Sequence, residues 1–396
     1  MSLKLISLRA KTNLPKEIHS LLDPEKQSQA RRYEREKRLL GLASLTLSLA
    51  ALLLFFYSGL STRAAHLFLG KPVAWTFLVY VTLLMAFLVL VGFPLSFYGS
   101  YAHEHKWKFS NQTVRSWLWE KAKSFGISLL ITYLILGLLL WIMARFAPIW
   151  WLFAGAGMAL VSVVLATLFP VVILPIFNKY AAIEDRDLTD ALEKILSREG
   201  LRSSGFFRED TSRQTKKENA FLAGLGRTRR VVLADNLMRN MSRPEIESVI
   251  AHEVGHYRRR QIWKGIGIGT LEQLVVFWVI NLVMKALFPQ FLSSPRWNLA
   301  LLPMFVILTG IVSGLLFGPL GNALSRHFEK QADLYALENI KEKKAFMTAL
   351  AGLADRNLSN AYPEWWVKIL YYSHPPIGER LRTAELFGTD SHGFTQ

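Results

Sequence analysis

The stretch IWWLFAGAGMALVSVVLATLFPVVILPIF, residues 149–177, contains no Asp, Glu, Lys or Arg along its whole length. An apolar run of this kind can cross the hydrocarbon core of a bilayer, which takes about 20 residues of helix. Five further stretches are long enough: Leu39–Leu60, Pro72–Tyr98, Phe125–Ala144, Ile262–Phe288 and Asn298–Leu320. Of these, Ile262–Phe288 is the weakest, because it contains Lys264, Glu272 and Lys285. The sequence therefore predicts a mainly α-helical, polytopic membrane bundle with about six spans.

The composition agrees with residence in a membrane. Of the 396 residues, 51% are hydrophobic and 19% are charged, whereas soluble domains carry about 25% charged residues. The chain has no cysteine, which excludes disulfides, thiolate nucleophiles and metal sites built on Cys. The net charge of +17 fits nucleic-acid binding or basic loops at an anionic membrane surface. No nucleic-acid motif is present, so we expect the lipid bilayer, and no nucleic acid, as a partner.

The distribution of basic residues predicts the orientation in the membrane. The polar segment 1–38 ends in a basic cluster directly before the first span and does not resemble a cleavable signal peptide, which places the N-terminus in the cytoplasm. Of the 47 Lys and Arg, the opposite side then receives only Arg63, Lys71, Arg145, Lys285 and Arg296. We expect a cytoplasmic N-terminal segment (1–38), four spans (39–177), a cytoplasmic block (178–261), two spans (262–320) and a C-terminal cytoplasmic block (321–396).

The first cytoplasmic block predicts a small folded unit. Apolar residues at helical spacing indicate a helix over Asp187–Glu199, and short strands are expected over Asn219–Leu222 and Arg230–Leu233, on either side of a turn at Gly224 and Gly226. Ser242 followed by Glu245 is a capping-box pattern, which starts a helix that runs to Tyr257. Beyond Leu320 a helix is expected through about Arg356.

The capped helix carries His252-Glu253-Val254-Gly255-His256. Residues four apart share one helical face, so both imidazoles can reach one metal ion, and Glu253 can take a proton from metal-bound water. The alternative is a surface helix with two incidental histidines. A catalytic zinc site needs a third protein ligand and leaves its fourth position to water.

Glu329 is the candidate for that third ligand. It follows the sixth span on the cytoplasmic side, and Asp333, four residues later, shares its helical face. A metal-bound His usually donates its other N–H to a carboxylate, which Asp333 can supply. The alternative for Glu329 is an ion pair with a surface lysine.

Several motifs together resemble a known family. They are Val172–Asn178, Asn219-Ala220-Phe221 with Gly224-Leu225-Gly226, Val232–Asp235, Ala251–His256, Ser325-Arg326 with Glu329 and Ala332-Asp333, and Ser373–Pro376 with Glu379-Arg380. In order and rough spacing, from about Ser28 to Phe387, the chain is similar to the membrane zinc metalloproteases of the type I CAAX prenyl protease family. The resemblance implies a helical bundle enclosing a chamber, with a gluzincin-like protease domain that carries a small β element on the cytoplasmic side.

The same resemblance implies roles for individual residues. His252, His256 and Glu329 would bind one Zn²⁺ per chain, with Glu253 as the catalytic base. His374 would stabilise the oxyanion, the alternative being a turn histidine before Pro375. Arg326 would either orient Glu329 or the substrate or form a structural ion pair. The strand Asn219-Ala220-Phe221 is expected to pair with a substrate backbone, rather than serving only as an internal hairpin strand.

We therefore expect an integral-membrane zinc metalloendopeptidase that faces the cytoplasm and cleaves peptides or proteins that are lipidated or membrane-associated. The alternatives are a quality-control protease without prenyl specificity and a transporter or receptor with a vestigial metal site. Eukaryotic members have one more span before the stretch corresponding to Leu14–Lys37, so a prokaryotic inner-membrane protein is expected. Glu272 lies inside the fifth span and should face the bundle interior or a water-filled cavity, because a carboxylate that faces lipid is costly.

Overall fold

The computed structural model describes residues 20–387 with the exception of residue 225. Parts of the expected N- and C-terminal segments (1–19 and 388–396) and Leu225 of the Gly224–Gly226 turn lie outside the described residues. Backbone contacts divide the chain into two compact units. The first combines the described parts of 1–37, 166–263 and 318–396, and the second combines 38–165 and 264–317.

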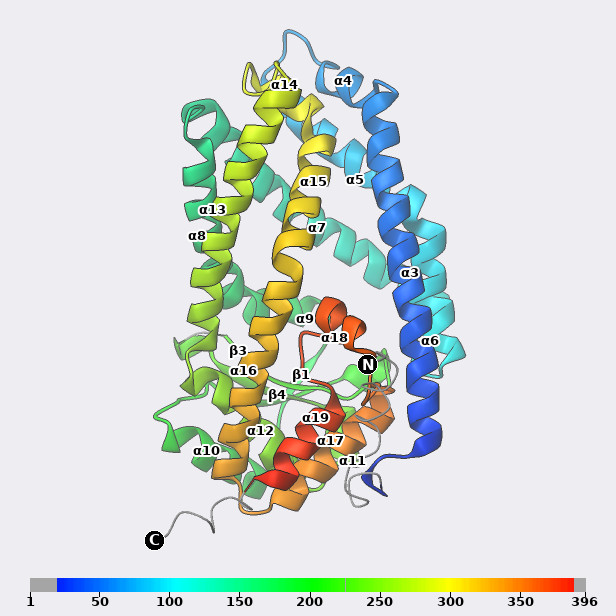
Figure 1. Cartoon of the computed structure of the whole chain (residues 1–396), viewed down its shortest axis with the longest axis vertical. Helices are drawn as coiled ribbons and strands as arrows, with labels where there is room; N and C mark the ends of the chain where they lie inside the picture. Colours follow the sequence, from blue (N-terminus) through cyan, green and yellow to red (C-terminus); the bar gives the residue numbers. More distant parts are fainter. Residues whose placement is uncertain (1–19, 225, 388–396) are drawn as a thin grey trace, which may run out of the picture. The chain divides into compact units, whose positions relative to one another are not determined.

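The second unit is a bundle of long helices (Figure 1). Its elements are the later part of α3 (Pro24–Tyr57), α4 (Leu60–Ala65), α5 (Val73–Phe97), α6 (His103–Lys106), α7 (Val114–Arg145), most of α8 (Trp150–Leu168) and of α13 (Gln261–Leu287), α14 (Pro295–Ala300) and α15 (Leu302–Val312). Short π-helical segments continue α5 into α6 (Tyr98–Ala102), α8 into α9 (Phe169–Ile173) and α15 into α16 (Ser313–Phe317).

Within the described residues, six helical runs are long and apolar enough to cross a membrane, which confirms the expected spans. They are Pro24–Tyr57, Val73–Lys106, Val114–Arg145, Trp150–Phe177, Gln261–Leu287 and Leu302–Asn339. The sixth begins later than expected, because Asn298 belongs to the separate helix α14, whose N-cap is Ser294. Pro303 then occupies the first turn of α15, a position at which proline's missing N–H does no harm.

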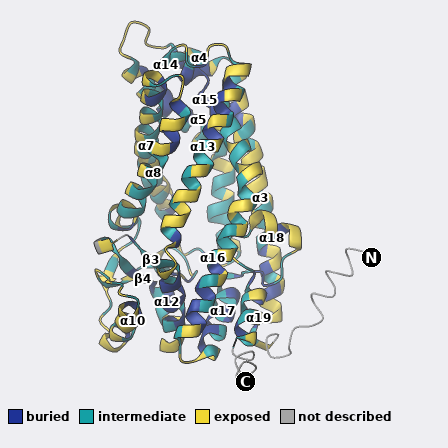
Figure 2. Cartoon of the chain, turned by 60° about the vertical axis from the view of Figure 1, so that its left-hand side comes forward, coloured by how far each residue is buried: buried dark blue, intermediate teal, exposed yellow. Residues whose placement is uncertain are grey.

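Many residues along the bundle helices are exposed (Figure 2), and a large share of them carry large apolar side chains. Leu134 and Leu160 are each 66% exposed, for example. Apolar surface on this scale requires lipid rather than water around it. The bundle has its own core around the fully buried Trp150, whose indole N–H donates to Asn281 Oδ1 at 2.8 Å. Glu272 is half-buried in α13.

The first unit contains a four-stranded sheet in the order β1 (Tyr180–Ala182), β2 (Phe206–Glu209), β4 (Arg230–Ala234) and β3 (Ala220–Ala223). β2 and β4 are parallel, and the two outer pairs are antiparallel. The expected β3–β4 hairpin is confirmed. β1 and β2 were not expected, because strands of three and four residues show too little alternation to stand out. β3 is an edge strand.

Helices surround this sheet and bury a common core that includes Leu192, Leu233, Ile250 and Phe346. They are α10 (Arg186–Arg198), α11 (Asp235–Asn240), α12 (Arg243–Arg258), α16 (Gly318–Asn339), α17 (Lys343–Asn357) and α19 (Ile377–Leu386). The short helices α9 (Leu174–Phe177) and α18 (Trp365–Tyr371) belong to the same unit. The expected helices α10 and α12 are confirmed, the latter with its capping box.

The segment expected to be helical from Leu320 to about Arg356 is helical, but it is divided into α16 and α17. At the end of α16 the Asn339 side chain donates to the Tyr335 carbonyl at 2.9 Å, a local bond that competes with continued helix. The new direction of α17 lets Phe346 and Leu350 pack in the core with Ile250 of α12.

Candidate metal centre

A glycine sets the distance between α12 and α16. A Cβ atom on Gly255 would lie 2.9 Å from the Cα of Ala332 and 3.2 Å from the Cβ of Tyr335. Because Gly255 has no side chain, the two backbones approach each other closely. Glu329 lies one turn before Ala332 and is thereby brought against the face of α12 that carries the two histidines.

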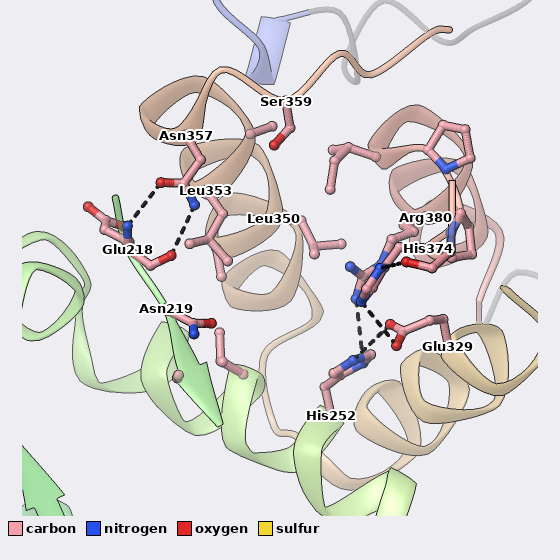
Figure 3. Close-up of a pocket in the computed structure, with 18 of the residues that line it drawn as sticks. Glu218, Asn219, His252, Glu329, Leu350, Leu353, Asn357, Ser359, His374 and Arg380 are labelled. Atoms are coloured by element: carbon pink, nitrogen blue, oxygen red, sulfur yellow. Dashed lines mark hydrogen bonds and ion pairs between the residues drawn. The ribbon is translucent and has the colours of Figure 1, made fainter. Parts of the chain in front are cut away.

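Three side chains converge at this contact. His252 Nε2 lies 3.2 Å from His256 Nε2 and 3.2 Å from Glu329 Oε2, and His256 Nε2 lies 3.4 Å from Glu329 Oε1. One donor atom from each residue falls within 4.8 Å of the others. Figure 3 shows His252 and Glu329 pointing toward each other from their two helices.

These residues fit a metal ion. Ligands at zinc–nitrogen and zinc–oxygen distances of about 2.0–2.2 Å stand about 3.3 Å apart in a tetrahedral site, close to the separations found here. Glu329 Oε2 is buried and forms no hydrogen bond, although His252 Nε2 is nearby. A buried acceptor without a donor is costly in a folded protein and suits an atom that binds a cation. Two imidazoles and a carboxylate are a donor set that catalytic zinc sites use.

The other ring nitrogen of each histidine is held by a polar side chain. His252 Nδ1 lies 2.9 Å from Asp333 Oδ1, and His256 Nδ1 is hydrogen-bonded to Gln261 Oε1. These contacts leave both Nε2 atoms directed at the common point. Burial lowers the pKa of His252, but the nearby carboxylates of Asp333 and Glu329 raise it by more, to about 9. The carboxylates therefore make this point favourable for positive charge.

Arg380 of α19 pairs with Asp333 and completes the arrangement. Its guanidinium donates to both oxygens of that carboxylate, at 2.6 and 2.9 Å. Burial lowers the pKa of Arg380, but the charge of Asp333 raises it further, so the side chain stays cationic. Neither Gln261 nor Arg380 was expected in this role from the sequence. Arg380 belongs to a motif already noted, but nothing in its local pattern indicates a contact with Asp333.

His374 lies on the open side of the centre. Its Nε2 is 3.3 Å from Glu329 Oε1, its Nδ1 is 2.9 Å from the Ser373 hydroxyl, and its side chain is 62% exposed. The expectation that Arg326 orients Glu329 needs correction. Arg326 Nη1 instead donates to the carbonyl oxygens of Lys368 and Tyr372, at 3.0 and 2.6 Å, and so holds the segment that leads to His374.

A cavity of about 730 Å³ opens onto the centre. Its wall includes the three convergent residues, Glu253, His374 and Arg380, together with Asn219, Ala220 and Phe221 at the free edge of β3. Figure 3 shows part of this wall. The wall therefore contains every expected site residue except Arg326 and Asp333, and Asp333 contacts His252 from outside the cavity, as expected.

Comparison with known families decides the classification. The model of the CAAX prenyl protease N-terminal region, described as five membrane helices, matches residues 4–179, and the model of peptidase family M48 matches residues 182–386. The chain belongs to peptidase family M48. The M48 chain is thus an integral-membrane metalloprotease of the CAAX protease-like type, and its family implies a bound metal, typically zinc.

Relatives of this M48 chain cover nearly its full length. A Bacillus subtilis protein named uncharacterized metalloprotease YhfN is 28% identical, over 92% of this chain and 87% of the relative. CAAX prenyl protease 1 of Saccharomyces cerevisiae is also 28% identical, over 94% of this chain and 88% of the relative. The crystal structure of S. mikatae Ste24p superposes with a TM-score of 0.81 at 27% identity and covers 96% of this chain and 94% of that one.

Proposed function

We propose that His252, His256 and Glu329 bind one Zn²⁺ and that Glu253 is the catalytic base of a peptide-bond hydrolysis. The observation that carries this proposal is the convergence of two imidazole nitrogens and a carboxylate within 4.8 Å, next to a half-buried Glu253 in one cavity wall. Asp333 supports it, because its contact with Nδ1 of His252 fixes the ring with Nε2 toward the metal.

The proposed mechanism divides the work among these residues. A bound zinc ion supplies Lewis acidity and lowers the pKa of its water to about 7. Glu253 accepts the proton of the attacking water and later delivers it to the leaving amine. His374 is exposed to the cavity and donates a hydrogen bond to the oxyanion that develops on the scissile carbonyl. Arg326 acts through the segment before His374 rather than on Glu329.

The edge of β3 is the proposed binding element for the substrate. Asn219, Ala220 and Phe221 line the cavity, and a peptide that pairs with this edge is held by backbone bonds that are indifferent to its sequence. The names of two relatives, CAAX prenyl protease 1 and its homologue, support the proposal that the substrates of this chain are lipidated or membrane-associated peptides. A membrane protease without prenyl specificity is the second candidate, and the sequence-indifferent binding edge favours it.

The proposed location is the inner membrane of a prokaryote, with the centre facing the cytoplasm. The concentration of Lys and Arg in the N-terminal segment and the polar blocks supports this orientation. Since the chain has no cysteine, a single introduced cysteine can be labelled specifically and shows on which side of the membrane it lies. Asn111→Cys should react with a membrane-impermeant maleimide only from the cytoplasmic side, and Ser293→Cys only from the opposite side. The reverse pattern would contradict the orientation.

The enzymatic proposal is tested with purified protein and two peptides that differ only in a farnesyl group. Cleavage should stop with a chelator and return with Zn²⁺, and Glu253→Gln should abolish turnover while it retains the metal. Glu247→Gln, on the same helix but outside the cavity, is the matched control and should cleave normally. Cleavage by Glu253→Gln at the wild-type rate would refute the mechanism. Equal kcat/KM for the two peptides would select the protease without prenyl specificity.

A further inference from the structure

The backbone groups of β3 alternate in direction. In an antiparallel pair, successive residues direct their N–H and C=O groups toward the partner strand and then away from it. Asn219 accepts a hydrogen bond from the Ala234 N–H at 3.0 Å, and Phe221 lies opposite Val232. Asn219 and Phe221 therefore face β4, whereas the backbone groups of residues 218, 220 and 222 point to the free edge, where a substrate would pair.

The outward groups of Glu218 are already occupied. Its N–H donates to Asn357 Oδ1 at 2.9 Å, and its C=O accepts from Asn357 Nδ2 at 3.0 Å. Figure 3 shows both bonds. The Asn357 amide thus takes the place of one residue of a neighbouring strand. The arrangement is anchored, because the Glu218 side chain is buried and paired with Arg356 and Asn240, each at 2.6 Å.

The outward groups of Leu222 are occupied as well. Its N–H donates to Glu253 Oε2 at 3.5 Å, and its C=O accepts from the Tyr257 hydroxyl at 3.2 Å. The same hydroxyl lies 2.7 Å from the carbonyl of Gly224, the next outward group along the edge. Tyr257 therefore covers both carbonyls beyond Ala220.

The ring of Tyr257 is held in this position by a basic side chain. The Arg229 guanidinium stands 4.7 Å above the ring centroid, a cation–π contact. This contact fixes the ring while its hydroxyl donates to the carbonyls of Leu222 and Gly224.

Ala220 is left between these two closed positions. In the described part of the chain its N–H and C=O have no partner outside the sheet, and it lines the cavity beside the metal centre. We propose that Asn357 and Tyr257 limit β-strand addition to this one residue, so that a substrate pairs with Ala220 and leaves the edge on both sides of it. This inference rests on the proposed function of the site.

The limit has a consequence for the class of substrate. A protease that pairs with many residues needs a long extended segment, whereas this edge needs an extended backbone only at the residue opposite Ala220. Residues on either side are free to turn away, so a residue that bears a bulky group, such as a lipid chain, can stand close to the cleavage point. Tyr257 and Asn357 would therefore determine substrate geometry without taking part in the chemistry.

The test is an N-methylation scan of whichever of the two peptides the enzyme cleaves faster. Each backbone N–H other than the scissile one is methylated in turn, and KM is measured. In the wild type a single position should be sensitive, the one that donates to Ala220 C=O, with KM raised about three- to tenfold by the lost hydrogen bond. Two sensitive positions separated by two residues in the wild type would overturn the proposal.

Two conservative variants should each open one further pairing site. Tyr257→Phe frees the Leu222 carbonyl, and Asn357→Asp frees the Glu218 carbonyl while it keeps an acceptor for the Glu218 N–H. Each should add a second sensitive position two residues from the first, on opposite sides in the two variants. Tyr180→Phe, which removes a hydroxyl bonded to Glu209 at the far edge of the sheet, is the control and should leave the scan unchanged.

The outcomes separate this inference from the proposed function. Scans of both variants identical to that of the wild type would overturn the inference while chelator-sensitive, Glu253-dependent cleavage still supports the function. Cleavage that persists in Glu253→Gln would refute the function itself, whatever the scan shows.

Discussion

Arg380 and Asp333 form a two-pronged ion pair that is almost wholly withdrawn from solvent, with side chains 11% and 3% exposed. Asp333 in turn contacts Nδ1 of His252. The orientation of a proposed metal ligand is therefore set by a guanidinium 128 positions later in the chain. Removing one partner of a buried pair leaves an uncompensated charge, so the contact is sensitive to substitution.

We expect Arg380→Met to weaken metal binding by about 10- to 100-fold, the usual effect of losing an outer contact to a metal ligand. Asp333 would lose the two bonds that hold it against His252. The affinity is measured by competition with a chromophoric chelator. Arg382→Met, an exposed position on the same helix, serves as the control. An unchanged affinity in Arg380→Met would mean that Asp333 keeps its place without the guanidinium.

Gly255→Ala should destabilise the first unit by about 1–3 kcal/mol, because the new methyl group meets the backbone of Ala332 and forces α12 and α16 apart. Metal affinity should fall with it, since Glu329 moves away from the histidines. Gly321→Ala on α16, whose Cβ meets nothing within 4 Å, should be neutral or slightly stabilising. Thermal unfolding in detergent compares the two variants. Equal midpoints would show that the helices tolerate the extra methyl group.

Arg326→Met should lower kcat about tenfold without changing metal content. Loss of an oxyanion donor itself costs about 100-fold or more, and here the donor remains but its segment is released from Arg326. A double-mutant cycle with His374→Ala is the decisive measurement. In the His374→Ala background, Arg326→Met should have no further effect on kcat. Additive losses would assign Arg326 a role independent of His374.

The capping box of α12 predicts a pH-dependent contribution to stability. Burial alone raises the pKa of Glu245, but hydrogen bonds from the Ser242 backbone and side chain bring it below its ordinary value. A carboxyl group whose pKa is lowered by folding stabilises the fold at pH values above its unfolded-state pKa of about 4.3. This stabilisation is lost as the pH falls through the folded-state pKa. Ser242→Ala should therefore cost about 1 kcal/mol near neutral pH.

The difference between Ser242→Ala and the wild type should shrink toward pH 4 and below, as Glu245 takes up a proton. Unfolding midpoints at several pH values measure it. Ser197→Ala, an exposed position in α10, provides a comparison that should be independent of pH. A constant difference for Ser242→Ala over the same range would show that the charge of Glu245 does not contribute to the cap.

Much of the fold was predictable because its signals are local. The bilayer imposes long apolar runs, and the spacing of His252 and His256 is a property of one helix. Ser242 and Glu245 likewise mark a helix start within four residues. The structure confirms each of these elements.

The remaining parts of the site depend on contacts between distant segments. Asn357 and Tyr257 reach β3 from α17 and α12, and Gln261 reaches His256 from the start of α13. None of these residues belongs to a periodic pattern or a ligand spacing. The partners of Arg326, the carbonyls of Lys368 and Tyr372 before His374, likewise lie more than 40 positions away in the sequence.

The contacts that link His252 to Arg380, by way of Asp333, also tie the proposed metal centre to the order of synthesis. The HEVGH helix is synthesised long before residue 380 leaves the ribosome, and until α19 has folded back onto α16 the buried carboxylate has no counter-charge to hold it. We therefore expect the proposed centre to reach its full affinity for metal only once α19 is in place.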